Sequence, residues 1–517
     1  MSENYFYTKT TFRSPSFIKN KDQKLPVNEN IFFTPGNSLQ LEYVNAANGK
    51  WDAIIYRPEI RAQDHFKTVK YLSFHLYSIQ GTTSESLHEI QLMSVDSVLS
   101  KKCFFQITKT NSWKQVIIPI DSFGIKIKNA PDITTVVFSQ RNNDGKKHTV
   151  YIDDIEFLSS MPAHEVTEQP IITEAKGCVK HIDIKWKSIS DTAIKYVKIY
   201  RAIDEKNYQP IGIQLPIISR YADFTGETGK SYSYKISFLN SNYQETNLSA
   251  PVSAQTRSMT DDEILSMVQE ACFRYYWEGA ESNSGLAKED IPGRENMIAI
   301  GASGFGIMAL IVGTKRNFIT REQSVERFTK IVDFLEKAET FHGALPHFAD
   351  GPTKKVEPFF GSRDNGGDLI ETSFLMQGLL AARAYFNRDN EKEKVISDKI
   401  TQMWQRVEWD WYKQSPDSKF LFWHWSPDKG WVINHNLIGW NETMVAYLLA
   451  IASPTHAIPA SMYYTGWANQ ESRGQQYRSA WGGTKEGSMY TNGDTYFGIK
   501  LDVGVSNGGP LFFTHYS

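Results

Sequence analysis

The sequence has only three cysteines among its 517 residues, Cys103, Cys178 and Cys272, and they lie far apart. Such spacing excludes a disulfide framework and argues against a cysteine-based zinc site. Blocks of like charge are also absent, since 56 Lys and Arg residues against 58 Asp and Glu residues give a net charge of −2. Because phosphate contacts need clustered basic side chains, nucleic acid is not an expected partner.

Long hydrophobic runs are lacking as well. The most apolar segment, at 298–312, is short and broken by glycines, so the sequence predicts no membrane span. The first six residues have neither the basic patch nor the apolar run of a secretory signal, which leaves a cytoplasmic protein or one whose signal has been removed. Aromatic residues, in contrast, reach 13% of the chain. At roughly 150 residues per domain, the length predicts three or four domains.

Residues 1–160 are expected to form a β-sandwich. Alternating apolar and polar residues, bounded by turn residues, predict strands at 38–44, 71–77, 113–120, 135–139 and 149–157. Regularly spaced short strands are typical of a sandwich. The run VYIDDIEF at 150–157 is similar to the last strand of a galactose-binding-like, carbohydrate-binding jelly roll.

A second sandwich is expected over residues 165–257, after a linker rich in Ser, Pro, Thr and Glu. Strands are predicted at 181–186, 196–200 and 232–238 by the same alternation. The order of Trp186, Tyr200, Tyr221, Tyr232 and Tyr234 resembles a fibronectin type III module. We expect this part of the chain to serve as a spacer or docking domain.

From residue 258 to 517 the periodicity becomes helical. Capping boxes at 260–263 and 320–323 begin amphipathic helices, and a third amphipathic stripe runs from 395 to 411. Between them, segments 303–312, 369–385 and 443–452 are apolar almost all round and should be buried on every side. This alternation predicts an (α/α)6 toroid, in which the N-termini of the inner helices gather at one end.

The helix count falls short of a complete toroid. Twelve helices are needed and the sequence predicts six before residue 453, with the start of another inner helix at 510–517. Because a half-ring would expose large apolar faces, the sequence predicts an incomplete version of a longer protein, in which parts of the site are absent.

Two acidic clusters open successive inner helices. Asp364, Asp368 and Glu371 lie in DNGGDLIE at 364–371, where Asp368 and Glu371 fit either an N-terminal cap or a catalytic group. Glu442 precedes the next inner helix, where its charge could simply complement the helix dipole. If the two helices point the same way, however, both clusters face one opening.

Paired carboxylates are the chemistry that acetal cleavage needs. One acid protonates the departing oxygen, and a second group drives attack at the sugar carbon. For Glu442 to be the acid, burial against Trp440 and nearby carboxylates must outweigh the opposing effect of the helix N-terminus.

Tryptophans supply flat apolar surfaces for sugar rings and N–H donors for hydroxyls. Histidines such as His342 lack metal-ligand spacing with a partner acid, so neither a metal nor a cofactor is predicted. The expected substrate-binding residues are Trp440, Trp425, Trp423, His424, Trp277, Phe305 and His347.

Residues 258–517 resemble the glucoamylase-like bacterial family that includes endo-β-1,2-glucanases, glycoside hydrolase family 144. The motifs that carry the resemblance are RYYWEG at 274–279, SGFG at 303–306, FHGALPH at 341–347, DNGGDLIE at 364–371, WHWSP at 423–427, WNE at 440–442, SPTH at 453–456 and GGPLFFTH at 508–515. The resemblance implies an (α/α)6 barrel that hydrolyses β-1,2-glucan with inversion. It places functional acids at Asp364, Asp368 and Glu371 and the general acid at Glu442. Trp440 replaces a tyrosine that is frequent in the family.

Two alternatives stay open at this point. The chain could be a glycan-binding protein that has lost catalysis, or an exo-acting enzyme whose product length is set by loops near 423–440 and 461–497. An oligosaccharide or polysaccharide is the expected partner in every case, and the substrate class implies a periplasmic or secreted protein. The sequence gives no oligomeric state.

Overall fold

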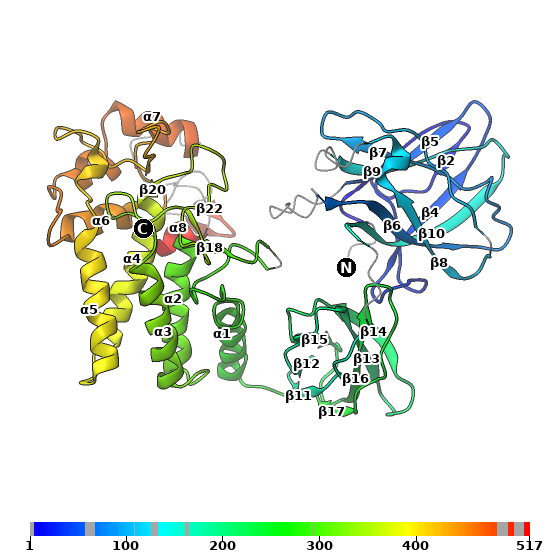
Figure 1. Ribbon diagram of the computed structural model, residues 1–517, viewed down its shortest axis with the longest axis horizontal. Helices are drawn as coiled ribbons and strands as arrows, with labels where there is room; N and C mark the ends of the chain where they lie inside the picture. The colour runs from blue at the N-terminus through cyan, green and yellow to red at the C-terminus, as the bar shows by residue number, and fades with distance from the viewer. Residues whose placement is uncertain are drawn as a thin grey trace. The chain divides into compact units, whose positions relative to one another are not determined.

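The structure, a computed structural model, describes residues 5–56, 68–107, 109–125, 133–160, 165–291, 293–482, 495–500 and 511–516. The chain forms two compact units, Met1–Thr260 and Asp261–Ser517 (Figure 1). The first unit holds β-sheets and the second is mainly helical, as the change of periodicity near residue 258 predicts.

The N-terminal sheets form a sandwich around an apolar core that includes Trp51, Phe74 and Phe138. One sheet has the order β1-β5-β9-β7 and the other the order β2-β4-β10-β6-β8, with β3 beside β4. All five strands predicted in this region are confirmed, and β4 has the predicted bounds. The strands are β1 (Thr8–Arg13), β2 (Phe17–Ile18), β3 (Val27–Asn28), β4 (Ser38–Val44), β5 (Lys50–Tyr56), β6 (Tyr71–Ser78), β7 (Glu89–Ser94), β8 (Trp113–Pro119), β9 (Ile133–Ser139) and β10 (Lys147–Leu158).

A second sandwich with its own core follows, built around Trp186, Tyr234 and Phe238. A three-stranded sheet of order β11-β12-β15 accompanies a four-stranded sheet of order β14-β13-β16-β17. The three predicted strands correspond to β12, β13 and β16. The bounds are β11 (Ile172–Gly177), β12 (His181–Trp186), β13 (Ile194–Ala202), β14 (Gln209–Gln214), β15 (Arg220–Phe224), β16 (Ser231–Asn240) and β17 (Val252–Gln255).

The helical unit places α2, α4 and α6 side by side, while α3 packs against α5. Its helices are α1 (Asp261–Trp277), α2 (Ile300–Lys315), α3 (Arg321–Leu335), α4 (Leu369–Tyr385), α5 (Glu391–Arg406), α6 (Met444–Ala452), α7 (Ser472–Gly482) and α8 (Leu511–Tyr516). Short strands pair in the connecting loops: β18 (Met297–Ala299) with β19 (Phe348–Asp350), β20 (Gly367–Asp368) with β21 (His424–Trp425), and β22 (Thr495–Tyr496) with β23 (Ile499–Lys500). In Figure 1, β18 and β20 lie at the same end of this unit.

Glycines allow α2 and α4 to approach backbone to backbone. A Cβ atom on Gly304 would lie 2.1 Å from the carbonyl oxygen of Phe374, and one on Gly378 would lie 2.5 Å from the carbonyl oxygen of Gly304. The glycine-rich segment at 301–306 thus allows close packing of the two helices. The predicted capping box at Thr320 and Gln323 is also present at the start of α3.

Two expectations about the helices are wrong. Burial on every side fails for α2, where Met308 and Val312 are exposed, and for α6, where Leu448 is exposed, because no described helix covers those faces. The third amphipathic helix ends at Arg406 rather than 411, so Trp411 lies in a short 3₁₀ helix, Trp411–Lys413, and is 41% exposed.

Helix α7 was not predicted, whereas α8 falls within the segment expected to begin a helix. Part of the predicted loop near 461–497 and part of the motif at 508–515 cannot be placed, because residues 483–494 and 501–510 lie outside the described residues. No helix among those that the structure describes is both long and apolar enough to span a membrane.

Candidate functional site

The site is built where α2 and α4 begin. A two-residue ladder pairs Asp368 with His424 and Gly367 with Trp425. The backbone N–H of Leu369 also donates to the carbonyl of Trp423, at 2.8 Å. This ladder brings the WHW motif against the acidic cluster although the two are more than fifty residues apart in sequence.

Asp368 is the centre of the cluster and is fully buried, with 0% exposure. Its Oδ1 accepts from the backbone N–H of Glu371 at 2.9 Å, so Asp368 is the N-cap of α4. Its Oδ2 accepts from Nε1 of Trp423 at 2.6 Å. The expected cap is therefore present, since one oxygen caps the helix while the other faces the cluster, and a catalytic role of Asp368 stays a prediction.

His347 bridges two carboxylates. Its Nδ1 lies 3.1 Å from Oδ2 of Asp368, and its Nε2 lies 3.9 Å from Oε1 of Glu371. Burial disfavours the charged imidazole, but the interactions with Asp368, Glu371 and Asp364 outweigh it and raise the pKa of His347 to about 9. At neutral pH this histidine is a cation.

Glu371 lies against the start of α2, where the backbone N–H of Gly301 donates to its carboxylate. Burial and the charge of Asp368 raise the pKa of Glu371 to about 8, while His347 and Gly301 oppose that shift. Glu371 is thus a carboxyl group that keeps its proton near neutral pH, a property shared by many catalytic acids.

Gly301 leaves room for the Glu371 carboxylate because it has no side chain. A Cβ atom at Gly301 would lie 1.9 Å from Oε2 of Glu371, so Gly301→Ala must displace the carboxylate. Misplacing a reacting group by about 1 Å can cost about 10²-fold in rate, and we expect a loss of that order in kcat. As a control, Gly306→Ala crowds the Tyr276 ring instead and should leave kcat within a few-fold of the wild type. Equal losses in both variants would contradict this role of Gly301.

The charge on His347 predicts a pH dependence of stability. Because the folded pKa of about 9 lies above the ordinary value of 6.5, the ion pair stabilises the fold fully below pH 6.5 and this contribution is lost as pH rises through 9. Each pH unit between those values corresponds to about 1.4 kcal/mol. Urea unfolding from pH 6 to 10 should therefore show a decline in stability for the wild type that His347→Gln flattens. Parallel curves for the two proteins would contradict the assignment.

Asp364 and His424 complete the buried cluster. Oδ1 of Asp364 lies 4.0 Å from Nε2 of His424, and both side chains are buried. Burial raises the pKa of Asp364 to about 6, against the opposing charge of His347. Burial lowers the pKa of His424, so this imidazole is neutral and can donate or accept a hydrogen bond.

The same donor atoms could hold a metal ion, since one atom each from His347, Asp368 and Glu371 lies within 4.8 Å of the others. The hydrogen bonds favour a different use. Oδ2 of Asp368 already accepts from Trp423, so a metal ion there would compete with this hydrogen bond and with the proton on His347. The donor set therefore fits a charged hydrogen-bonded cluster better than a metal centre.

Glu442 lies in the turn before α6, which begins at Met444 rather than 443. Burial raises the pKa of Glu442, its own backbone N–H opposing the shift. The charge of Glu442 contributes to the raised pKa of Tyr477 on α7. Tyr477 also accepts a hydrogen bond from the Asn441 side chain at 3.0 Å. The shared cavity of Glu442 and Asp368 stays a prediction.

The aromatic residues expected to bind sugar differ in their surroundings. Trp425 is partly exposed and packs edge-on against His342, with ring centroids 4.8 Å apart. Trp440 is 7% exposed and packs against Trp467, and the guanidinium of Arg327 lies over the ring of Trp277 at 4.3 Å. Trp425 and Trp277 are therefore both partly exposed, whereas Trp440 is buried, and contact of these three residues with sugar stays a prediction. The side chain of Phe305 on α2 is exposed.

Sequence reasoning missed two aromatic residues near the cluster. Phe360 is 57% exposed and packs edge-on against His347, with centroids 5.2 Å apart. Trp411, which fitted the core stripe of a helix, stacks on His342 with centroids 3.7 Å apart. An aromatic residue four positions before the DNGGD motif was the signal available for Phe360. None was available for Trp411, because its helix ends early.

Known proteins that are similar to this chain bind or hydrolyse carbohydrates. A family model for carbohydrate binding domain 30 matches residues 3–159, and the Glycoamylase (glucoamylase) model matches residues 434–517. The exo beta-1,2-glucooligosaccharide sophorohydrolase (non-reducing end) of Parabacteroides distasonis is 51% identical over 525 residues, which cover 100% of this chain and 73% of that protein. The crystal structure of a beta-1,2-glucanase from Parabacteroides distasonis matches with a TM-score of 0.94 at 50% identity, covering 100% of this chain and 75% of the other.

The resemblance expected from the motifs is therefore confirmed, and it extends through both sandwiches and the helical unit. This chain belongs to the glucoamylase-like family of β-1,2-glucan-acting glycoside hydrolases, glycoside hydrolase family 144.

Proposed function

We propose that this chain hydrolyses β-1,2-linked gluco-oligosaccharides or β-1,2-glucan, cutting from the non-reducing end to release the disaccharide sophorose. The observation that carries the proposal is the buried cluster of Asp368, Glu371 and Asp364 around a cationic His347. Such a cluster offers both charged and protonated carboxyl groups at neutral pH, which acetal hydrolysis requires.

In this proposal Glu442 donates the proton to the departing oxygen, and the reaction inverts the anomeric carbon. Burial supports a protonated Glu442 because it raises the pKa of this group. Asp364, Asp368 and Glu371 bind hydroxyls and position water, while Trp423 and Trp425 contact the sugar rings. Trp423 is suited to this because its N–H is already fixed by Asp368.

The roles proposed for the other domains fit the same substrate. The N-terminal sandwich would bind glycan, the second sandwich would act as a fibronectin type III-like spacer, and the helices would belong to an (α/α)6 barrel. Glucans of this size occur outside the cytoplasm, so we propose a periplasmic or secreted protein.

The decisive experiment is a product analysis. Incubating the full chain with a β-1,2-linked glucopentaose should release sophorose from the first time point, whereas an endo-acting enzyme would release a mixture of lengths. A β-1,4-linked glucopentaose is the matched control and should stay intact. Binding of the β-1,2 substrate without new reducing ends would overturn hydrolysis and favour a glycan-binding protein.

A further inference from the structure

A second group of chemically reactive side chains lies far from the acidic cluster in the chain, on the hairpin that joins β11 and β12. Gly177 pairs with Ile182, so the next residues along the hairpin, Cys178 and His181, lie opposite each other. The carbonyl of His181 accepts a hydrogen bond from the backbone N–H of Cys178 at 2.9 Å. Residues directly opposite each other, and residues two apart on one strand, share a face of a sheet. Cys178, His181 and Asp183 therefore share one face.

That face points away from the core of the second sandwich. Ile182 and Ile184, which alternate with His181 and Asp183 along β12, are buried in the core, whereas His181 and Asp183 are partly exposed. Cys178 differs because it is fully buried although it lies on the outer face. The group thus has a buried thiol on one side and solvent access on the other.

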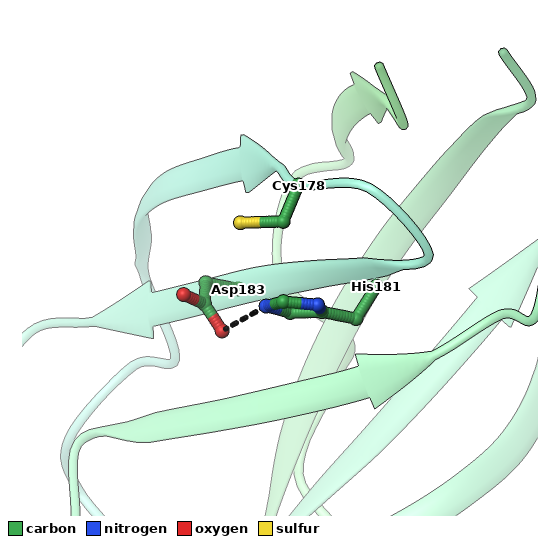
Figure 2. Close-up of side chains that lie close together, drawn as sticks. All are labelled: Cys178, His181 and Asp183. Atoms are coloured by element: carbon green, nitrogen blue, oxygen red, sulfur yellow. Dashed lines mark ion pairs between the residues drawn. The ribbon is translucent and has the colours of Figure 1, made fainter. Parts of the chain in front are cut away.

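The three donor atoms converge. Nε2 of His181 lies 3.7 Å from Oδ1 of Asp183, and one atom from each of Cys178, His181 and Asp183 lies within 4.8 Å of the others. Figure 2 shows the imidazole and the carboxylate facing each other, with the thiol projecting toward the Asp183 end of the group.

These separations are close to those of a tetrahedral zinc ion. With Zn–N and Zn–O bonds of about 2.1 Å and a Zn–S bond of about 2.3 Å, neighbouring ligand atoms lie about 3.4–3.6 Å apart. The His181–Asp183 pair already meets this distance within a few tenths of an ångström. The thiol lies within 4.8 Å of the other two ligand atoms, so it must approach them by no more than about 1.2 Å.

The hairpin is held in place by its neighbours. The carbonyl of Cys178 accepts from the backbone N–H of Arg257 at 2.9 Å, and the carbonyl of Lys180 accepts from that of Thr225 at 2.9 Å. Such anchoring preorganises ligands and lowers the cost of ordering them when an ion binds. Lys176 lies opposite Asp183 in the ladder, but among the described ion pairs Asp183 pairs with His181.

We propose that Cys178, His181 and Asp183 form a zinc-binding site, with water as the fourth ligand. A soft thiolate, an imidazole and a carboxylate together suit Zn²⁺ better than Mg²⁺ or Ca²⁺, which prefer oxygen ligands alone. Binding forms a Zn–S bond and breaks the S–H bond of Cys178, whose proton passes to solvent. The wide spacing of the cysteines does not oppose such a site, because it uses only one of them.

The test is cobalt and zinc titration of the full chain after removal of metals with a chelator. Co²⁺ bound by a thiolate gives a charge-transfer band in the near ultraviolet, and the acidic cluster around Asp368 contains no thiol, so this band reports only on a cysteine site. We expect one Zn²⁺ per chain to displace the cobalt and abolish the band.

Variants locate the ligands. Cys178→Ser should abolish the band. Asp183→Asn keeps the thiol but removes a ligand, so it should lower the affinity for Zn²⁺ by more than the loss of an outer-shell partner does, which is about 10–100-fold. Cys272→Ser, at an exposed cysteine, is the matched control and should change nothing. A wild-type protein without the band, or a band that survives in Cys178→Ser, would overturn the proposal. Circular dichroism of each variant separates loss of the site from loss of the fold.

Discussion

Replacing Glu442 with glutamine is expected to lower the turnover of β-1,2-gluco-oligosaccharides by about 10²–10⁴-fold, the range attributed to general acid catalysis. Glutamine keeps the size of the side chain but has no proton of suitable acidity to give the departing oxygen. Because burial already favours the neutral form of Glu442, the substitution should leave the thermal unfolding midpoint almost unchanged. Initial rates of reducing-end formation, measured at saturating substrate, test the expectation.

A leaving group that needs no protonation distinguishes an acid from a binding residue. With an aryl β-sophoroside, whose phenolate departs unaided, Glu442→Gln should recover most of the wild-type rate. Asp364→Asn is the matched comparison, because a residue that binds hydroxyls is needed for both substrates and its loss should slow both. If Glu442→Gln turned over the natural substrate at a near-normal rate, Glu442 would not be the acid.

Replacing Asp368 with alanine is expected to destabilise the helical unit by about 3–5 kcal/mol, the cost of breaking a buried ion pair. The change removes the N-cap of α4, leaves the Trp423 N–H without its acceptor, and removes the carboxylate that pairs with the His347 cation. Catalysis should be abolished as well. Urea unfolding followed by tryptophan fluorescence measures the stability.

A second helix cap provides the control. Asn390 caps α5 through the backbone N–H of Glu393 in the same way as Asp368 caps α4. Asn390→Ala should therefore cost only about 1 kcal/mol, the usual worth of a cap, and leave activity intact. A similar small cost for Asp368→Ala would mean that the residue is merely a cap and that the ion pair contributes little.

Much of the fold follows from local sequence. Alternation along β4 and β12 and the capping box at Thr320 each depend on residues close together in the chain, and all three were predictable. The N-cap role of Asp368 was predictable for the same reason. Family motifs, rather than periodicity, indicated the substrate class.

The contacts between distant segments were not predictable. The ladder that sets Asp368 beside His424 consists of two residues in each strand, which is too short to leave a periodic pattern. The cationic state of His347 depends above all on Asp368, which belongs to another segment. Trp411 was misassigned because a hydrophobic stripe continues past the residue where the helix hydrogen bonds end.

The most direct test of the account is the anomeric form of the first product, followed by proton NMR while the wild-type chain cleaves a β-1,2-linked glucopentaose. Direct attack by water, with Glu442 as the acid, predicts that the α-anomer of the new reducing end appears first and then mutarotates. Initial formation of the β-anomer would contradict the account, because it would require a covalent intermediate on one of the carboxylates.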